Sequence, residues 1–153
     1  MFLLKVIDAL ARHRLKYAVV GGYAVALHGA ARGTVDVDLV INIDKKSLED
    51  AEAALEEIGL QSRQPVTADD VFQFREEYIR NRNMKAWGFI NPNNPTEMVD
   101  IVITEDLSDL STVTKKIGNK KINVVALPEL IRMKRESGRP QDLEDVKALE
   151  KIL

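Results

Sequence analysis

Two aspartates separated by one residue are the first feature that could carry out chemistry. Asp36 and Asp38 lie in the segment 35–43, whose alternating, β-branched sequence Val-Asp-Val-Asp-Leu-Val-Ile-Asn-Ile predicts a strand. Side chains two positions apart on a strand share a face, so both carboxylates would project together. The residues between and beside them would point the other way, into a core: Val35, Val37 and Leu39. Such a pair alone is more often part of a solvated face, so it needs support from other residues.

A third acid interrupts an apolar segment later in the chain. Asp100 lies in residues 97–103 (Glu-Met-Val-Asp-Ile-Val-Ile), which predict a strand. If this strand lies beside 35–43, Asp100 meets Asp36 and Asp38. Carboxylates in close contact repel one another, and a divalent cation relieves that cost. Because magnesium binds carboxylates together with substrate phosphates, the three acids predict a Mg²⁺ (or Mn²⁺) site for phosphoryl transfer.

A glycine pair precedes the acids. Gly21 and Gly22 follow a short apolar strand predicted at 16–20 and precede a helix predicted at 23–29. Glycine lets the backbone approach a ligand closely, and amides at a helix N-terminus attract phosphate. The alternative is a tight turn that binds nothing, so the weight of this pair comes from its spacing to the acids.

The rest of the chain must position these residues. Helical periodicity, caps and breakers predict further helices at 2–12, 45–57, 67–80, 128–136 and 141–152. Further strands are predicted at 85–90, 97–103, 113–117 and 120–126, the last two joined at Gly118-Asn119 as a hairpin. This order predicts an α/β (α+β) fold with a mixed β-sheet flanked by helices and two short C-terminal helices. The length of 153 residues suits a single domain, 1–153.

Composition excludes several classes of protein. The net charge of −2 gives no global electrostatic case for a nucleic acid or an anionic membrane as partner. The absence of cysteine excludes disulfides, zinc–thiolate sites and iron–sulfur clusters. No apolar run matches a signal peptide or a membrane span, so we expect a cytoplasmic protein without a membrane partner.

Other residues with chemical potential have simpler structural interpretations. His28, on the helix after the glycine pair, is expected to be packed or hydrogen-bonded, and Trp87 is expected to lie in the core. Asp142 and Asp145 begin the last predicted helix, where acids are explained as caps that face the helix dipole.

Taken together, these motifs resemble the DNA-polymerase-β-like nucleotidyltransferase superfamily. Its pattern is an apolar strand, Gly-Gly or Gly-Ser, a gap of about this length, Asp-x-Asp and a later strand acid. The stretch from Gly21 to Asp38 is similar to the minimal prokaryotic branch, which includes nucleotidyltransferases of abortive-infection and toxin–antitoxin systems. The closing segment 134–145 resembles the tail of those proteins, whereas 60–96 carries no motif.

The resemblance implies transfer of a nucleoside monophosphate from an NTP to an acceptor, with magnesium and release of pyrophosphate. The catalytic and metal-binding acids would be Asp36, Asp38 and Asp100, the last of which would also help to activate the acceptor hydroxyl. The nucleotide-binding residues would be Gly21, Gly22, Arg32 and Lys134, the last two as phosphate contacts.

The acceptor stays open at this point, because protein, tRNA and a small molecule all fit the sequence. The alternative function is a catalytically silent protein of the same fold, which binds nucleotide or pairs with a cognate toxin or antitoxin protein. The presence of all three acids favours the active enzyme.

Overall fold

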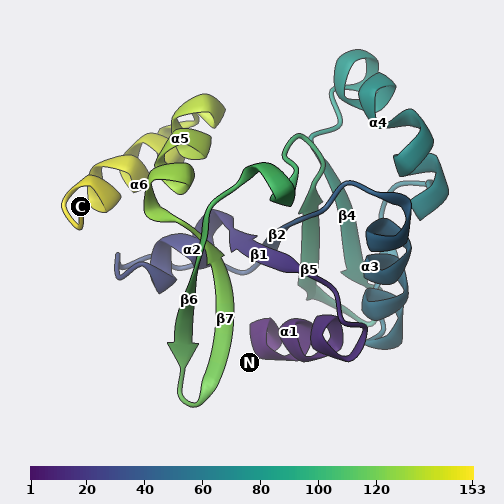
Figure 1. Cartoon of the computed structure of the whole chain (residues 1–153), viewed down its shortest axis with the longest axis horizontal. Helices are drawn as coiled ribbons and strands as arrows, with labels where there is room; N and C mark the ends of the chain where they lie inside the picture. The colour runs from purple at the N-terminus through teal and green to yellow at the C-terminus, as the bar shows by residue number, and fades with distance from the viewer.

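The computed structural model describes residues 1–153, arranged around a seven-stranded mixed sheet with the order β3-β4-β5-β2-β1-β7-β6 (Figure 1). The strands are β1 (Tyr17–Val20), β2 (Val37–Ile41), β3 (Gln61–Ser62), β4 (Ala86–Asn91), β5 (Asn94–Val102), β6 (Thr112–Ile117) and β7 (Lys120–Val125). The helices are α1 (Phe2–Arg12), α2 (Gly21–Leu27), α3 (Lys45–Glu57), α4 (Ala68–Arg82), α5 (Leu127–Ser137) and α6 (Pro140–Glu150), with a 3₁₀ turn at Leu107–Asp109. The expected α/β architecture is confirmed.

The helices form two groups on either side of the sheet. Helix α1 packs against α3, which packs against α4, whereas α2 packs against α5, which packs against α6 (Figure 1). The two C-terminal helices therefore stand beside the short helix that carries the glycine pair.

Local signals explain where several of these helices begin and end. Asp44 accepts a hydrogen bond from the backbone N–H of Ser47 at the start of α3. Thr67 and Asp70 form a reciprocal capping box at the start of α4. Gly138 adopts a left-handed conformation that ends α5. The two-residue strand β3 was not expected, because so short a pairing leaves no periodic pattern.

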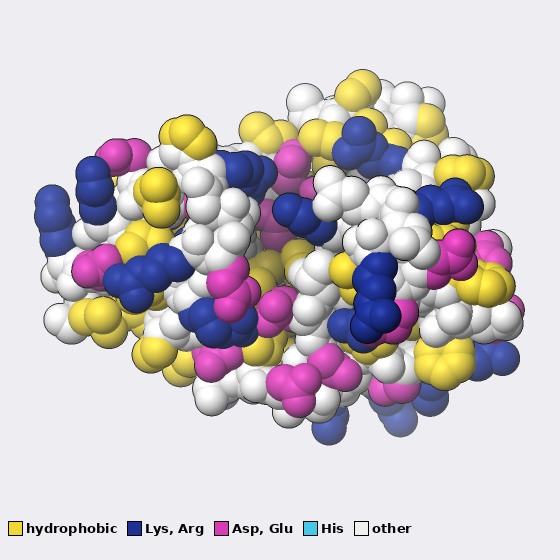
Figure 2. All heavy atoms as spheres, turned by 90° about the horizontal axis from the view of Figure 1, so that it is seen from above, with side chains coloured by type: hydrophobic (Ala, Val, Ile, Leu, Met, Phe, Trp, Pro, Cys, Tyr) yellow, Lys and Arg dark blue, Asp and Glu magenta, His cyan; other side chains and the backbone are white.

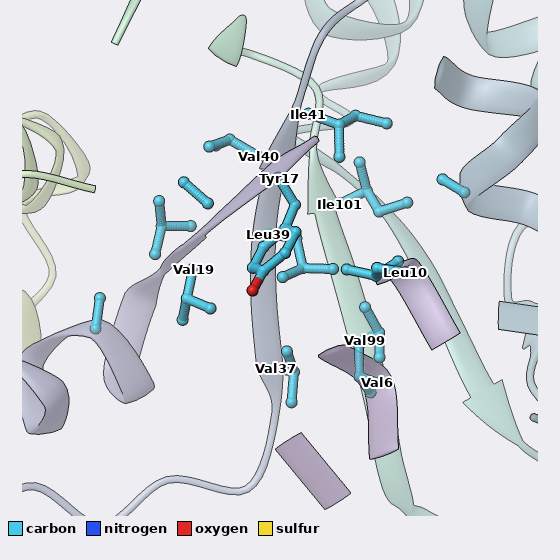
Figure 3. Packing of buried hydrophobic residues seen from close by; sticks show 14 of the residues in the cluster. Val6, Leu10, Tyr17, Val19, Val37, Leu39, Val40, Ile41, Val99 and Ile101 are labelled. Atoms are coloured by element: carbon cyan, nitrogen blue, oxygen red, sulfur yellow. The ribbon is translucent and has the colours of Figure 1, made fainter. Parts of the chain in front are cut away.

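Strand β2 lies at the centre of the sheet. It pairs with β1 in antiparallel fashion and with β5 in parallel. Its odd-numbered residues Val37, Leu39 and Ile41 are fully buried. They share a face with Val99 and Ile101 of β5, and Val6 and Leu10 of α1 cover that face (Figure 3).

The strand is shorter than its sequence suggested. We expected a strand over 35–43, but β2 starts at Val37, and Asp36 lies in the bend before it. The expectation that Val35 points into the core is wrong, since Val35 is 56% exposed. Its position lies beyond the β1–β2 pairing, whose last partners are Val20 and Asp38. The alternation of apolar and polar residues extends to Val35, but no strand is present there for residues 35 and 36 to pair with.

None of the helices combines the length and the apolar character that crossing a lipid bilayer demands.

The burial pattern predicts opposite outcomes for two residues of the same segment. Leu39→Ala removes a fully buried side chain and should lower the free energy of unfolding by about 2–5 kcal/mol. Val35→Ala should change it by less than about 0.5 kcal/mol, because Val35 is exposed. Urea denaturation measures both. A large loss for Val35→Ala would show that residue 35 belongs to the core after all.

Candidate functional site

Two of the three expected acids lie side by side. Asp38 of β2 and Asp100 of β5 are directly opposed in the parallel ladder. Both point away from the face that α1 covers, because Val37 and Leu39 on one strand and Val99 and Ile101 on the other occupy that face. The expectation that the two strands are neighbours is confirmed.

Asp36 lies in the bend before β2, two positions before Asp38. Its negative charge contributes to the raised pKa of both Asp38 and Asp100. However, Asp36 does not share the strand with Asp38, so the two-residue spacing is not what brings these carboxylates together. Their proximity depends on the path of residues 30–36, which lie in neither a helix nor a strand.

Nearby cations neutralise these carboxylates only in part. Burial, followed by the charges of Asp100 and Asp36, raises the pKa of Asp38 to about 7, although Lys134 and Arg139 oppose the rise. Burial and the charge of Asp36 also raise the pKa of Asp100, and the charge of Arg63 opposes that rise. This is the pattern of like charges held together in a partly desolvated place.

The glycines make room for the acids. A Cβ on Gly21 would lie 2.0 Å from Asp38 Oδ2, and Gly21 has a φ of +66°, which favours glycine. A Cβ on Gly22 would lie 2.7 Å from Thr34 Oγ1. Gly88 of β4 plays a similar part, since a Cβ there would lie 3.0 Å from Asp100 Oδ1. Gly21 therefore lies against Asp38 and Gly88 against Asp100, whereas Gly22 lies against Thr34. The sequence did not reveal the part of Gly88.

A cleft of about 600 Å³ opens over Asp38 and Asp100. Its charged and glycine lining residues are Gly21, Asp38, Lys85, Asp100, Glu105, Lys134, Glu136, Arg139 and Asp142. Strands β4 and β5 form one wall and helix α5 forms the other. Figure 2 shows a hollow between two parts of the molecule, with acidic side chains in its depth and basic side chains around it. A cleft of this size suits a small ligand.

The donor set suits a hard divalent cation. Asp38 and Asp100 offer carboxylate oxygens next to each other, and magnesium commonly takes one or two carboxylates plus substrate phosphates. The structure contains no preformed cluster of three or more acid or histidine side chains spaced to hold a metal by themselves. The residues present therefore fit a cation that is bound together with the phosphates of a nucleotide.

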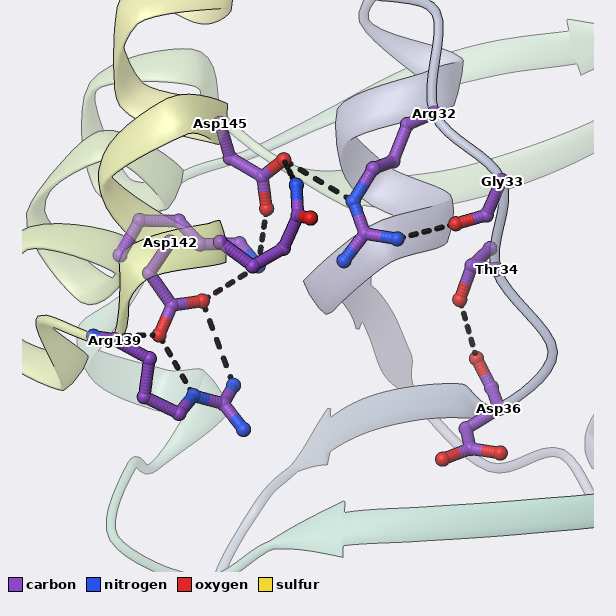
Figure 4. A network of polar contacts seen from close by, with 9 residues as sticks. Arg32, Gly33, Thr34, Asp36, Arg139, Asp142 and Asp145 are labelled. Atoms are coloured by element: carbon purple, nitrogen blue, oxygen red, sulfur yellow. Dashed lines mark hydrogen bonds and ion pairs between the residues drawn. The ribbon is translucent and has the colours of Figure 1, made fainter.

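The two expected phosphate contacts are both engaged with acids. Lys134 lines the cleft, but it is only 6% exposed, and its Nζ lies 3.1 Å from Asp142 Oδ1 and 3.0 Å from Asp145 Oδ2. Arg32 lies outside the cleft lining, and its Nε donates to Asp145 Oδ1 at 3.1 Å (Figure 4). Asp145, in the first half of α6, therefore pairs with both Arg32 and Lys134.

Arg139 is a cation in the cleft wall that the sequence did not single out. Its Nε donates to Asp142 Oδ2 at 2.8 Å, while its side chain remains 75% exposed (Figure 4). Asp142 also accepts from the backbone N–H of Arg139 at 3.2 Å, which confirms its role as a helix cap. No signal in the sequence distinguishes Arg139 from other surface arginines, because its position depends on the α5–α6 turn.

Two residues expected to be structural are confirmed as such. His28 is buried, and its Nε2 lies 2.8 Å from the carbonyl oxygen of Val125. Trp87 is fully buried in the core, where it packs on Phe89 and donates through Nε1 to Ser62 Oγ at 3.0 Å.

Known structures share this fold. Lincosamide antibiotic adenylyltransferase LnuA with bound lincomycin superposes with a TM-score of 0.67 at 15% identity, covering 99% of this chain and 96% of that one. ANT(2'')-Ia in complex with adenylyl-2''-tobramycin gives 0.62 at 12% identity, covering 98% and 90%. An antigenic nucleotidyltransferase-like protein from Paracoccidioides brasiliensis gives 0.58 at 18% identity, covering 97% and 74%. The expected nucleotidyltransferase fold is confirmed, whereas these matches lend no support to a toxin–antitoxin partner.

The sequence itself matches a family. No curated protein sequence matches the chain significantly. The sequence model of aminoglycoside-2''-adenylyltransferase, however, matches residues 2–149. This match covers nearly the whole chain and agrees with the resemblance to polymerase-β-like nucleotidyltransferases. The chain therefore belongs to the aminoglycoside-2''-adenylyltransferase family.

Proposed function

We propose that this nucleotidyltransferase transfers AMP from ATP to a hydroxyl group of a small antibiotic-like acceptor. The observation that carries the proposal is the direct opposition of Asp38 and Asp100 beneath the cleft. Membership of an adenylyltransferase family supports NMP transfer from an NTP in general and favours ATP as the donor.

The reaction breaks a phosphoanhydride bond of ATP and forms a phosphoester bond to the acceptor. The acceptor oxygen attacks the α-phosphorus of ATP, and the bond from that phosphorus to the pyrophosphate oxygen breaks. Such transfers depend mainly on alignment of the reacting groups and on neutralisation of phosphate charge. Mg²⁺ or Mn²⁺, when bound with the nucleotide, supplies that neutralisation.

The chain's own residues would act in three ways. Asp36, Asp38 and Asp100 would hold the cation that accompanies the nucleotide, and Asp100 would also accept the proton of the acceptor hydroxyl. Gly21 and Gly22 let the backbone approach the triphosphate closely. Arg139 is better placed than Lys134 to touch a phosphate, since its side chain is exposed in the cleft wall whereas Lys134 is buried between two carboxylates.

The acceptor proposal rests on the family and on size. Lincomycin and adenylylated tobramycin occupy two of the structurally similar enzymes, and the family is described by an aminoglycoside reaction. The cleft of about 600 Å³ falls within the range of small-molecule sites. Together these findings favour a small molecule over the protein and tRNA acceptors that the sequence left open.

The first prediction concerns activity. Purified protein incubated with Mg²⁺ and α-labelled ATP should pass label to an aminoglycoside or a lincosamide and release pyrophosphate. Asp38→Asn and Asp100→Asn should each lower the rate by at least about 10²-fold, because each loses a carboxylate that would hold the cation at the reacting phosphate. Asp109→Asn, at an exposed acid of the 3₁₀ turn, is the matched control and should retain the wild-type rate.

Separation of labelled products by chromatography gives the readout. Label that appears only in tRNA or protein from a cell extract would exclude the small-molecule acceptor. Full activity in Asp38→Asn would remove the proposed site altogether.

The close approach of Gly21 to Asp38 yields a second prediction. Gly21→Ala should lower the transfer rate about tenfold or more, because the new methyl group displaces the Asp38 carboxylate. Gly118→Ala is a matched control, since Gly118 has a similar φ of +60° but nothing within 4 Å of the added Cβ. Both variants carry the same kind of backbone strain. Equal loss of activity in the two would show that strain alone, not contact with Asp38, is responsible.

The raised pKa of Asp38 predicts a pH effect on stability. An acid whose pKa rises from its ordinary 3.8 to about 7 on folding binds its proton more tightly in the folded state. Folded protein therefore loses stability as the pH rises through this interval. In metal-free buffer, Asp38→Asn should be more stable than wild type at pH 8 but not at pH 4. Thermal melts check this, and a difference between the two proteins that does not change with pH would contradict it.

A further inference from the structure

The segment that carries Asp36 has no regular structure of its own. Residues 30–36 connect α2 to β2 without helix or strand, and Asp36 is the last of them. Nothing in a ladder or a helix therefore fixes Asp36, although its charge acts on both Asp38 and Asp100. Some other contact must hold this segment if Asp36 is to serve the site.

Two contacts hold it. Thr34 packs against Gly22, where a Cβ would be only 2.7 Å from Thr34 Oγ1, and its hydroxyl donates to the carbonyl oxygen of Asp36 at 3.4 Å. Arg32 donates through Nε to Asp145 of α6 at 3.1 Å and through Nη1 to the carbonyl oxygen of Gly33 (Figure 4). The second contact joins residues 113 positions apart in the sequence.

Asp145 is held rigidly enough to act as an anchor. Its side chain is only 4% exposed, and Gln141 donates to Oδ1 at 3.0 Å. Its other oxygen lies 3.0 Å from Lys134 Nζ, and Lys134 also pairs with Asp142 at 3.1 Å. An ion pair fixed on one side by a buried network constrains its partner far more than an exposed pair does.

We propose that Arg32 and Asp145 are positioning residues, which hold the segment 30–36 so that the Asp36 carboxylate stays beside Asp38 and Asp100. The proposal rests on the proposed function, since it gives Asp36 a task in that reaction. This role replaces the phosphate contact that the sequence predicted for Arg32. The Nε and Nη1 of Arg32 already donate to protein oxygens, and Arg32 does not line the cleft.

Arg32→Gln tests the proposal, with Arg135→Gln as the matched control. Arg135 of α5 pairs with Glu150 of α6 at 2.9 Å, so this control also removes an ion pair to α6 but none that involves the segment 30–36. Arg32→Lys keeps a positive charge opposite Asp145 and should therefore lose less activity than Arg32→Gln. It takes the place of Arg32→Gln in the test if that variant fails to fold.

The first readout needs no activity. Amide hydrogen exchange of metal-free protein should quicken in residues 30–36 of Arg32→Gln and remain unchanged there in Arg135→Gln. The second readout is the affinity for Mn²⁺ in the presence of a non-hydrolysable ATP analogue, measured by electron paramagnetic resonance. It should fall about 10–100-fold in Arg32→Gln, as is usual when a residue that orients a metal ligand is lost.

Kinetics separate positioning from substrate contact. Positioning predicts a lower kcat with little change in KM for ATP, whereas a phosphate contact predicts a raised KM and unchanged exchange. The proposal is overturned if exchange in 30–36 and Mn²⁺ affinity match those of Arg135→Gln. If wild-type protein transfers no AMP, the proposed function fails, while hydrogen exchange still decides whether Arg32 holds the segment.

Discussion

The parallel pairing of β2 with β5 positions both the apolar residues that α1 covers and the two acids on the opposite face. Its register sets Val37 opposite Val99, Asp38 opposite Asp100 and Leu39 opposite Ile101. The apolar pairs bury against α1, and this burial fixes the two acids on the opposite face. A shift of one residue on either strand would send its acid into the core, so the hydrophobic core and the acid site specify each other.

The same pairing brings partly buried carboxylates together, and the protein's own cations do not fully neutralise them. Burial and the charges of Asp100 and Asp36 raise the pKa of Asp38, and burial and the charge of Asp36 raise that of Asp100. Arg63 opposes the rise at Asp100, and Lys134 and Arg139 oppose it at Asp38 only partly, because Lys134 pairs with Asp142 and Asp145. A site that holds concentrated negative charge without neutralising it is well prepared for a cation carrying phosphates. The stability given up there is consistent with a functional role.

Sequence patterns were sufficient for much of this picture. Each expected helix and strand is present within a few residues, because amphipathic periodicity and capping residues such as Asp44 and Thr67 act locally. The sequence could not predict that the two acid-bearing strands are neighbours, because neither strand alone shows which strand it pairs with. It predicted only that the acids would meet if the strands were neighbours. The start of β2 was predicted two residues too early, at Val35, because alternation does not show where a neighbouring strand stops pairing.

The residues that form the wall of the cleft were harder to predict from the sequence. Lys134, predicted as a phosphate contact, lines the cleft, but its two acidic partners come from another helix. The partner of Arg32 lies 113 residues away, and no local pattern reports such a contact. Arg139 and Gly88 have roles that arise only when turns and strands are placed in space. The sequence therefore predicted the local structure and the acids themselves. It did not predict the contacts between segments that are distant in the chain.

We propose that Asp38 and Asp100 hold a nucleotide through a divalent cation. Calorimetric titration of wild-type protein and of Asp100→Asn with a non-hydrolysable ATP analogue, with and without Mg²⁺, decides this. Binding to the wild type should require Mg²⁺ and should be weakened strongly in Asp100→Asn. Equally tight binding without Mg²⁺, or unchanged Mg²⁺-dependent binding in Asp100→Asn, would rule out a nucleotide held in this way.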